Sequence, residues 1–217
     1  FGKTICAMQL MRELDVKRTL IITHRPVVGE SWLQAFKQVV GSKSSEPKVK
    51  GNSDIHKTYG FGMRSDDESE TVGNYYDLES FVETPGNHYA FFVSMQYIRL
   101  SELVNSKTQA KNAGVGNTTS ASNEKLKADI LKTDWDLIII DEAHEGILTS
   151  LGKGVIHDFL KKEKTKMLYL SGTPFNLYED FKEDEIYTWD YIAEQTAKHN
   201  WNLEHPNEKN PYAELPK

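Results

Sequence analysis

The chain is poor in cysteine, in long apolar runs and in net positive charge, and each shortage excludes a class of protein. A single cysteine, Cys6, in 217 residues excludes an internal disulfide and a zinc cluster built from cysteines, as suits a reducing cytoplasm. No apolar stretch is long enough to span a bilayer, and we expect no cleavable leader and no membrane partner. The sequence therefore predicts a cytoplasmic protein, in which we expect Cys6 to pack in the interior.

The net charge of −6 sets a limit on nucleic-acid binding, because proteins that bind nucleic acids are often basic. Acidic residues are concentrated in two separable segments, 66–70 and 179–185, which hold nine of the 32. A phosphate backbone needs a positive stripe rather than a positive protein, so the charge leaves nucleic-acid binding open. It predicts that partner domains supply much of the basic surface.

The most informative motif is Asp141-Glu142-Ala143-His144, which ends the apolar run 137–140. Two carboxylates after a buried run lie at the carboxyl end of a strand, where open α/β sheets bind their ligands. This is the layout of a Walker B strand, in which Asp141 would hold Mg²⁺ and Glu142 would polarise the water that attacks the γ-phosphate of ATP. An acidic turn after an ordinary strand is the alternative for these four residues alone.

A second motif, Gly2-Lys3-Thr4, opens a stretch of helical pattern. It matches the end of the phosphate-binding loop G-x-x-x-x-G-K-[ST], in which Lys3 would reach the β- and γ-phosphates and Thr4 the Mg²⁺ ion. The first half of that loop is absent from the sequence, so the tripeptide is weak alone. The order of loop, helix, strand at 19–23 and Walker B strand is the order that such a fold requires.

A third motif, Ser171-Gly172-Thr173-Pro174, follows the apolar run 167–170 and looks like the Ser-Ala-Thr coupling element of superfamily-two helicases and translocases. An ordinary strand-ending turn is the alternative for these residues alone. All three motifs in one order leave little room for coincidence.

Together the motifs resemble the first motor domain of a DEAD/DEAH-type superfamily-two ATPase over positions 1–180, most of all the restriction subunit of type III restriction enzymes and its type I relatives. The resemblance implies an α/β, RecA-like P-loop NTPase domain, with a mainly parallel sheet flanked by helices. It implies a DNA-dependent ATP hydrolase of the helicase or translocase type that uses ATP and Mg²⁺. Its implied partners are double-stranded DNA, a second RecA-like domain, and nuclease or methyltransferase components.

The same resemblance gives roles to residues outside the ATP motifs. It implies that His144 contacts the Ser171-Gly172-Thr173 turn or the second motor domain, and so links the nucleotide state to movement. Two strand-ending turns resemble backbone-contacting motifs of the superfamily, which places five residues on nucleic acid: Thr23, Arg25, Pro26, Ser94 and Gln96.

Two alternatives stay open. The Asp-Glu-Ala-His motif also occurs in RNA helicases, so the first alternative is an RNA helicase motor. The other is a binding or assembly module that keeps the fold without hydrolysis. The sequence does not decide between DNA and RNA, or between strand separation and translocation.

Residues 181–217 are expected to form an arm toward a second motor domain that is absent here, with helix-like spacing over 186–196. Segment 41–88 has weak periodicity and is predicted to be partly an insertion over the sheet edge, and 110–123 is predicted to be a flexible loop. Because no Arg-rich finger motif occurs and the phosphate loop is cut, we expect these 217 residues alone to be inactive.

Overall fold

A five-stranded parallel sheet organises the protein, for which the computed structural model describes residues 2–40, 58–63, 86–95, 98, 130–146 and 164–213. The strand order is β2-β3-β1-β4-β5, and every neighbouring pair is parallel. The predicted α/β class with a parallel sheet is therefore confirmed. The strands are β1 (Arg18–Thr23), β2 (Thr58–Met63), β3 (Asn87–Ser94), β4 (Leu137–Asp141) and β5 (Lys166–Tyr169).

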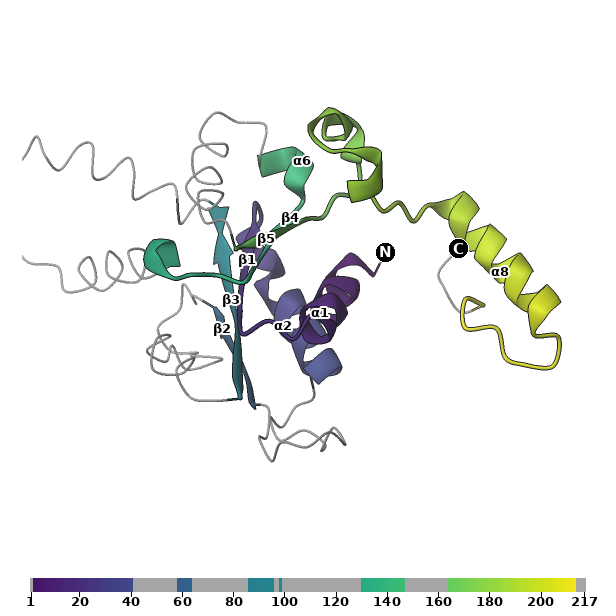
Figure 1. Ribbon diagram of the computed structural model, residues 1–217, viewed down its shortest axis with the longest axis horizontal. Helices are drawn as coiled ribbons and strands as arrows, with labels where there is room; N and C mark the ends of the chain where they lie inside the picture. The colour runs from purple at the N-terminus through teal and green to yellow at the C-terminus, as the bar shows by residue number, and fades with distance from the viewer. Residues whose placement is uncertain are drawn as a thin grey trace, which may run out of the picture. The chain divides into compact units, whose positions relative to one another are not determined.

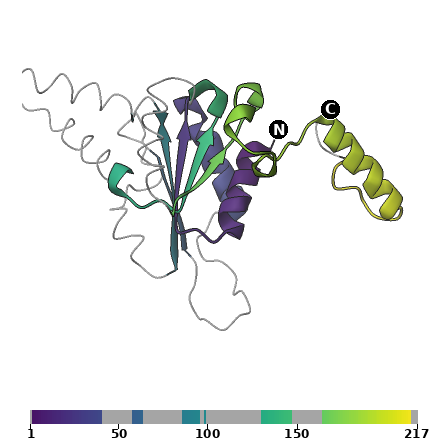
Figure 2. The same cartoon turned by 45° about the horizontal axis from the view of Figure 1, so that its top comes forward.

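Helices α1 (Lys3–Glu13) and α2 (Gly29–Val40) lie side by side on one face of this sheet (Figures 1 and 2). Both turn an apolar stripe inward, and the buried cluster includes Met8 from α1, Phe36 from α2 and Ile139 from β4. Cys6 lies outside this stripe and is exposed, so its expected packing role is wrong. The stripe of α1 is instead formed by Ala7, Met8 and Met11.

The three central strands, β1, β3 and β4, carry continuous buried runs rather than alternating ones, as is typical of parallel strands that are buried on both faces. Leu20, Ile21 and Ile22, in the central strand β1, are each 0 % exposed although successive side chains point to opposite faces. The apolar runs seen in the sequence thus serve the two-sided core, and polar residues lie where the strands end.

Strand β2 lies inside the segment 41–88 that was predicted to be partly an insertion. It pairs in parallel with β3 and extends the sheet at that edge. Gly62 permits this pairing, since a Cβ built there would lie 1.9 Å from the hydroxyl oxygen of Tyr89. The rest of the segment and the predicted loop 110–123 lie outside the described residues.

The chain divides into two compact units, Phe1–Pro174 and Phe175–Lys217, whereas the predicted domain boundary lies between 180 and 181. The second unit contains α8 (Tyr191–Glu204), which starts later and runs further than the spacing over 186–196 indicated. Asp190 sets its start, since its carboxylate accepts a hydrogen bond from the Ala193 N–H at 2.8 Å. Three short 3₁₀ turns precede α8: η2 (Pro174–Asn176), η3 (Tyr178–Asp180) and η4 (Glu183–Glu185).

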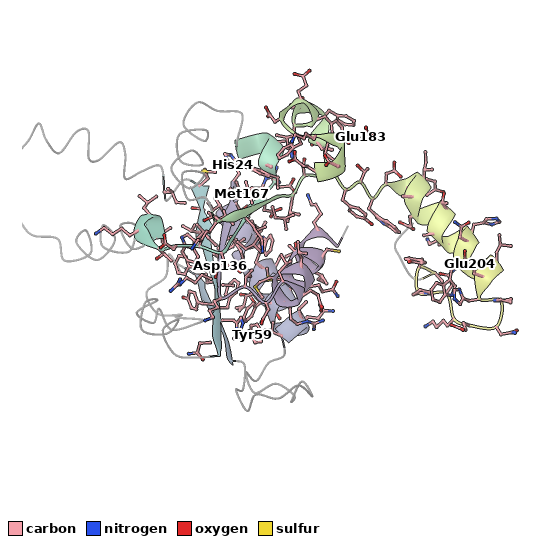
Figure 3. All side chains as sticks on the ribbon, viewed as in Figure 1. His24, Tyr59, Asp136, Met167, Glu183 and Glu204 are labelled. Carbon is pink, nitrogen blue, oxygen red and sulfur yellow. The ribbon has the colours of Figure 1, made fainter. Side chains whose placement is uncertain are left out.

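Because all the strands run in one direction, the sheet has a carboxyl edge, where the strands end, and an amino edge, where they begin (Figure 3). His24 follows the carboxyl end of β1, and Asp136 precedes the amino end of β4, so the two lie at opposite edges. Within the described part of the chain, no helix is both long and apolar enough to cross a membrane.

Candidate active site

The carboxyl edge of the sheet brings together strand ends that are far apart in sequence. Thr23, the last residue of β1, lies in register with Ser94 of β3 on one side and with Asp141 of β4 on the other. The first predicted acid and two of the predicted nucleic-acid residues therefore lie at one level of the sheet.

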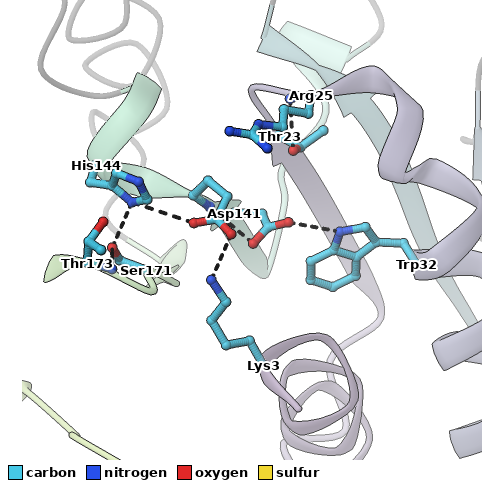
Figure 4. Close-up of polar contacts among 9 residues, drawn as sticks. Lys3, Thr23, Arg25, Trp32, Asp141, His144, Ser171 and Thr173 are labelled. Carbon is cyan, nitrogen blue, oxygen red and sulfur yellow. Dashed lines mark hydrogen bonds and ion pairs between the residues drawn. The ribbon is translucent and has the colours of Figure 1, made fainter. Parts of the chain in front are cut away.

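Lys3 reaches this edge from the start of α1. Gly2, the residue before the helix, has a left-handed backbone (φ 75°), which glycine adopts readily, and no side chain in the described part of the chain caps the first turn. The N–H groups of that turn and the Lys3 ammonium together suit an anion such as a phosphate. Lys3 Nζ donates to Glu142 Oε1 at 2.8 Å across 139 positions of sequence (Figure 4).

Asp141 and Glu142 leave β4 in a constrained turn. Glu142 has a φ of 48°, in the left-handed region that residues other than glycine seldom adopt. Such a conformation costs on the order of 1–3 kcal/mol and is common at functional sites. The Glu142 N–H donates to Asp141 Oδ1 at 3.0 Å, so the turn that redirects the chain also holds the first acid.

Burial raises the pKa of Asp141 above its ordinary value, and this effect outweighs the others. A hydrogen bond from Trp32 Nε1 to Asp141 Oδ2, at 3.2 Å, acts in the opposite direction, as does the Lys3 ammonium. The neighbouring Glu142 carboxylate adds to the increase. A cation beside such a buried carboxylate favours its charged form.

His144, in the short helix α6 (Ala143–Gly146), links the second acid to the turn after β5. Its Nδ1 lies 2.8 Å from Ser171 Oγ and 3.5 Å from Glu142 Oε2. The Thr173 N–H also donates to Ser171 Oγ, at 3.1 Å. A Cβ built on Gly172 would lie 3.5 Å from Lys3 Nζ, which places the turn beside the lysine.

The donor set fits Mg²⁺ that arrives with a nucleotide better than a metal held by protein alone. Among the described residues no group of three or more His, Cys, Asp or Glu could hold a metal ion. Magnesium is commonly held by one or two carboxylates, with phosphates and waters completing its octahedron. Asp141 and the hydroxyl of Thr4, next to Lys3 in the first turn of α1, are ligands of that kind.

The predicted nucleic-acid residues occupy the same edge as far as the structure describes them. Thr23 Oγ1 accepts a hydrogen bond from the Arg25 N–H at 3.2 Å, which closes the turn after β1. Arg25 is exposed, and Pro26 starts the 3₁₀ turn η1 (Pro26–Val28) that leads into α2. Gln96 lies outside the described residues. Contact of these residues with nucleic acid stays a prediction.

Trp32 is the site residue that the sequence did not reveal. Its ring is 1 % exposed, and such a tryptophan at an inward position of α2 is indistinguishable in sequence from an ordinary core residue. A buried indole N–H usually finds an acceptor, but nothing in the sequence names that acceptor as Asp141.

A family model for the type III restriction enzyme, res subunit, matches residues 1–176. The chain belongs to this family. It is a superfamily-two RecA-like domain and a helicase-like, ATP-binding motor domain of the restriction enzyme type, as the motifs predicted. The family implies ATPase or helicase activity, use of a nucleotide and usually Mg²⁺, and interaction with DNA and partner subunits. A search of curated proteins found no match.

Proposed function

We propose that this chain is the first motor domain of a DNA-dependent ATPase that moves along or opens double-stranded DNA within a restriction-modification enzyme. One observation carries the proposal: a continuous chain of polar contacts joins all three predicted motifs. It runs from Lys3 through Glu142 and His144 to Ser171. These residues come from α1 and from the ends of β4 and β5, and sequence proximity does not explain their meeting.

The ion pair between Lys3 and Glu142 suggests how the site responds to its substrate. Bound Mg–ATP would supply the γ-phosphoryl group and a divalent counter-charge. Lys3 then turns from Glu142 Oε1 toward the phosphates, which leaves that carboxylate to orient a water molecule and accept its proton. Asp141 would take the cation that accompanies the nucleotide.

His144 connects Glu142 to the Ser171 turn, so that the movement of Lys3 from Glu142 to the phosphates can affect the rest of the motor. Its Nδ1 lies within reach of both Glu142 Oε2 and Ser171 Oγ. When Lys3 releases Glu142, the balance of contacts at His144 changes, and the Ser171 turn responds. That turn ends the first compact unit, whose boundary lies at Pro174.

Nucleic acid would meet the same edge at the exposed Arg25, whose turn begins at Thr23, one strand from Asp141. Family membership favours double-stranded DNA over RNA. The test is the ATPase rate of the intact motor, meaning the motor with its complete phosphate loop and second RecA-like domain, measured without nucleic acid and with double-stranded DNA, single-stranded DNA or RNA.

We expect double-stranded DNA to stimulate hydrolysis most, to a turnover within the usual enzyme range of about 1 to 10³ per second. Stimulation by RNA alone would identify an RNA motor instead. Nucleotide binding without hydrolysis under every condition would identify a binding or assembly module of the same fold.

A further inference from the structure

Trp32 makes a contact at the carboxyl edge that the proposed chemistry does not use. Its indole Nε1 lies 3.2 Å from Asp141 Oδ2, across 109 positions of sequence. In Figure 4 the ring approaches Asp141 from α2, on the side opposite to His144.

The Asp141 carboxylate is held at both oxygens. Oδ1 accepts from the Glu142 N–H at 3.0 Å, and Oδ2 accepts from Trp32. Two donors on the two oxygens fix the rotation of the carboxylate about its Cβ–Cγ bond, a torsion that is otherwise broad. One donor belongs to the backbone, so Trp32 is the side chain that completes the restraint.

The ring that supplies this donor has little freedom of its own. Trp32 is 1 % exposed and belongs to the buried cluster that includes Met8 and Ile139. Dense packing leaves a ring of this size no room to turn, so the fold sets the direction of its N–H.

We propose that Trp32 is the positioning residue of Asp141, whose carboxylate it holds in the orientation that takes Mg²⁺ together with the nucleotide. The inference rests on the proposed function, which makes Asp141 the acid for Mg²⁺. Hydrogen-bond partners behind a metal ligand typically change metal affinity roughly 10- to 100-fold when they are removed.

Trp135 is the matched control for this role. It is 2 % exposed, and its indole N–H also makes a single buried hydrogen bond, to the Ile130 carbonyl at 2.8 Å. Its acceptor is backbone, and the residue precedes β4 at the amino edge of the sheet. A purely structural indole should therefore behave like Trp135, and a positioning indole should not.

The first test compares Trp32→Phe with Trp135→Phe in the intact motor. Phenylalanine keeps an aromatic ring and removes the N–H. We expect Trp32→Phe to raise the Mg²⁺ concentration for half-maximal binding of a fluorescent ADP roughly tenfold or more, and to leave binding in EDTA unchanged. Trp135→Phe should leave both values unchanged. Equal shifts in the two variants, or no shift in Trp32→Phe, would overturn the proposal.

A second measurement needs no change in the core and decides the matter if Trp32→Phe does not fold. 5-Fluorotryptophan is placed at position 32 alone by codon suppression, or at position 135 alone as the control. The ¹⁹F resonance at position 32 should move when Mg²⁺ and ADP are added, and not when ADP is added with EDTA. The resonance at position 135 should stay in place. A stationary signal at position 32 would contradict the proposal.

The two proposals fail in different ways. If Glu142→Gln hydrolysed ATP at the normal rate, the proposed catalysis would be wrong, while a Mg²⁺ shift in Trp32→Phe would still support the role of Trp32. If Glu142→Gln were inactive and Trp32→Phe kept the normal Mg²⁺ dependence, only the proposed role of Trp32 would be wrong. If the unaltered motor bound no Mg–ADP, both proposals would be wrong.

Discussion

The two edges of the sheet hold the same kinds of residue and use them differently. The carboxyl edge has Asp141, His144 and Trp32, and the amino edge has Asp136, His88 and Trp135. At the amino edge Asp136 Oδ2 accepts from the N–H groups of Lys17 and Arg18, at 3.1 and 2.9 Å, and Trp135 binds a backbone carbonyl. These contacts close the fold.

At the carboxyl edge most partners are other side chains, and several of these stay accessible. At the amino edge His88 also pairs with a side chain, that of Asp15, but His88 is buried. The side chains of Lys3, Glu142 and His144 are 29 %, 30 % and 21 % exposed, and they contact one another or Ser171. Side-chain partners can be exchanged for a ligand, whereas backbone partners cannot leave without opening the sheet. Residue type alone does not mark a site; the edge and the kind of partner do.

The largest expected difference between the edges is between the two aspartates. Asp141→Ala should lower ATP hydrolysis by the intact motor roughly a hundredfold or more and weaken Mg²⁺-dependent nucleotide binding, because it removes the cation ligand. Asp136→Ala should instead lower the free energy of unfolding by about 1–3 kcal/mol, because two N–H groups lose their acceptor. Steady-state rates and urea unfolding of both variants measure this contrast, and a normal rate in Asp141→Ala would break it.

The two histidines should separate coupling from stability. His144→Ala removes the link between Glu142 and Ser171, and we expect stimulation by DNA to fall roughly 5- to 150-fold, the usual range of coupling between sites. His88 is buried, with Nε2 2.9 Å from Asp15 Oδ1 and Nδ1 3.0 Å from the Gly86 carbonyl oxygen. His88→Ala should therefore cost about 1–3 kcal/mol of stability. Equal loss of stimulation in both variants would show that His144 is structural.

Two arginines test the nucleic-acid contact: Arg18 begins β1, and Arg25 lies in the turn that follows its end. Arg25→Ala should weaken DNA binding about equally across sequences and lower the slope of log affinity against log salt by roughly one unit, because one phosphate contact is lost. Arg18→Ala, which removes the same charge at the amino edge, should leave the slope unchanged. Binding titrations at several salt concentrations measure both, and equal slopes would make Arg25 a structural arginine.

The smallest expected effect concerns pH. Because burial raises the pKa of Asp141, the folded protein takes up a proton there before the unfolded chain does as the pH falls. Between the ordinary pKa of aspartate and the raised value, stability attributable to this group increases as the pH is lowered. The difference in unfolding free energy between the unaltered protein and Asp141→Asn should therefore shift in favour of the unaltered protein from pH 7 to pH 4. A shift of opposite sign would contradict the burial of a charged Asp141.

The sequence predicted much of this fold because several strands are apolar runs that end in polar motifs. The runs at 19–23, 137–140 and 167–170 all became strands of one parallel sheet, and chain order alone brought their polar ends to a common edge. Strand β2 was missed because its two glycines, Gly60 and Gly62, weaken the strand pattern, and only the close approach of Tyr89 explains Gly62.

The sequence predicted the motif residues of the site, but not the contacts and the backbone conformation that hold those residues in place. Lys3 and Glu142 belong to motifs with known spacing, so the sequence indicated that they would meet. The bond between Trp32 and Asp141 depends on how α2 packs on the sheet, and the left-handed turn at Glu142 depends on where β4 ends. Both follow from tertiary geometry, which the sequence does not state.

In the proposed function, the polar network at the carboxyl edge hydrolyses ATP. Glu142→Gln keeps the shape of the side chain and removes its basicity, so the intact motor should still bind ATP while single-turnover hydrolysis slows roughly a hundredfold or more. Asp136→Asn, the same chemical change at the amino edge, should leave the rate per folded molecule unchanged. If Glu142→Gln hydrolysed bound ATP at the normal rate, the network would not be the site of hydrolysis.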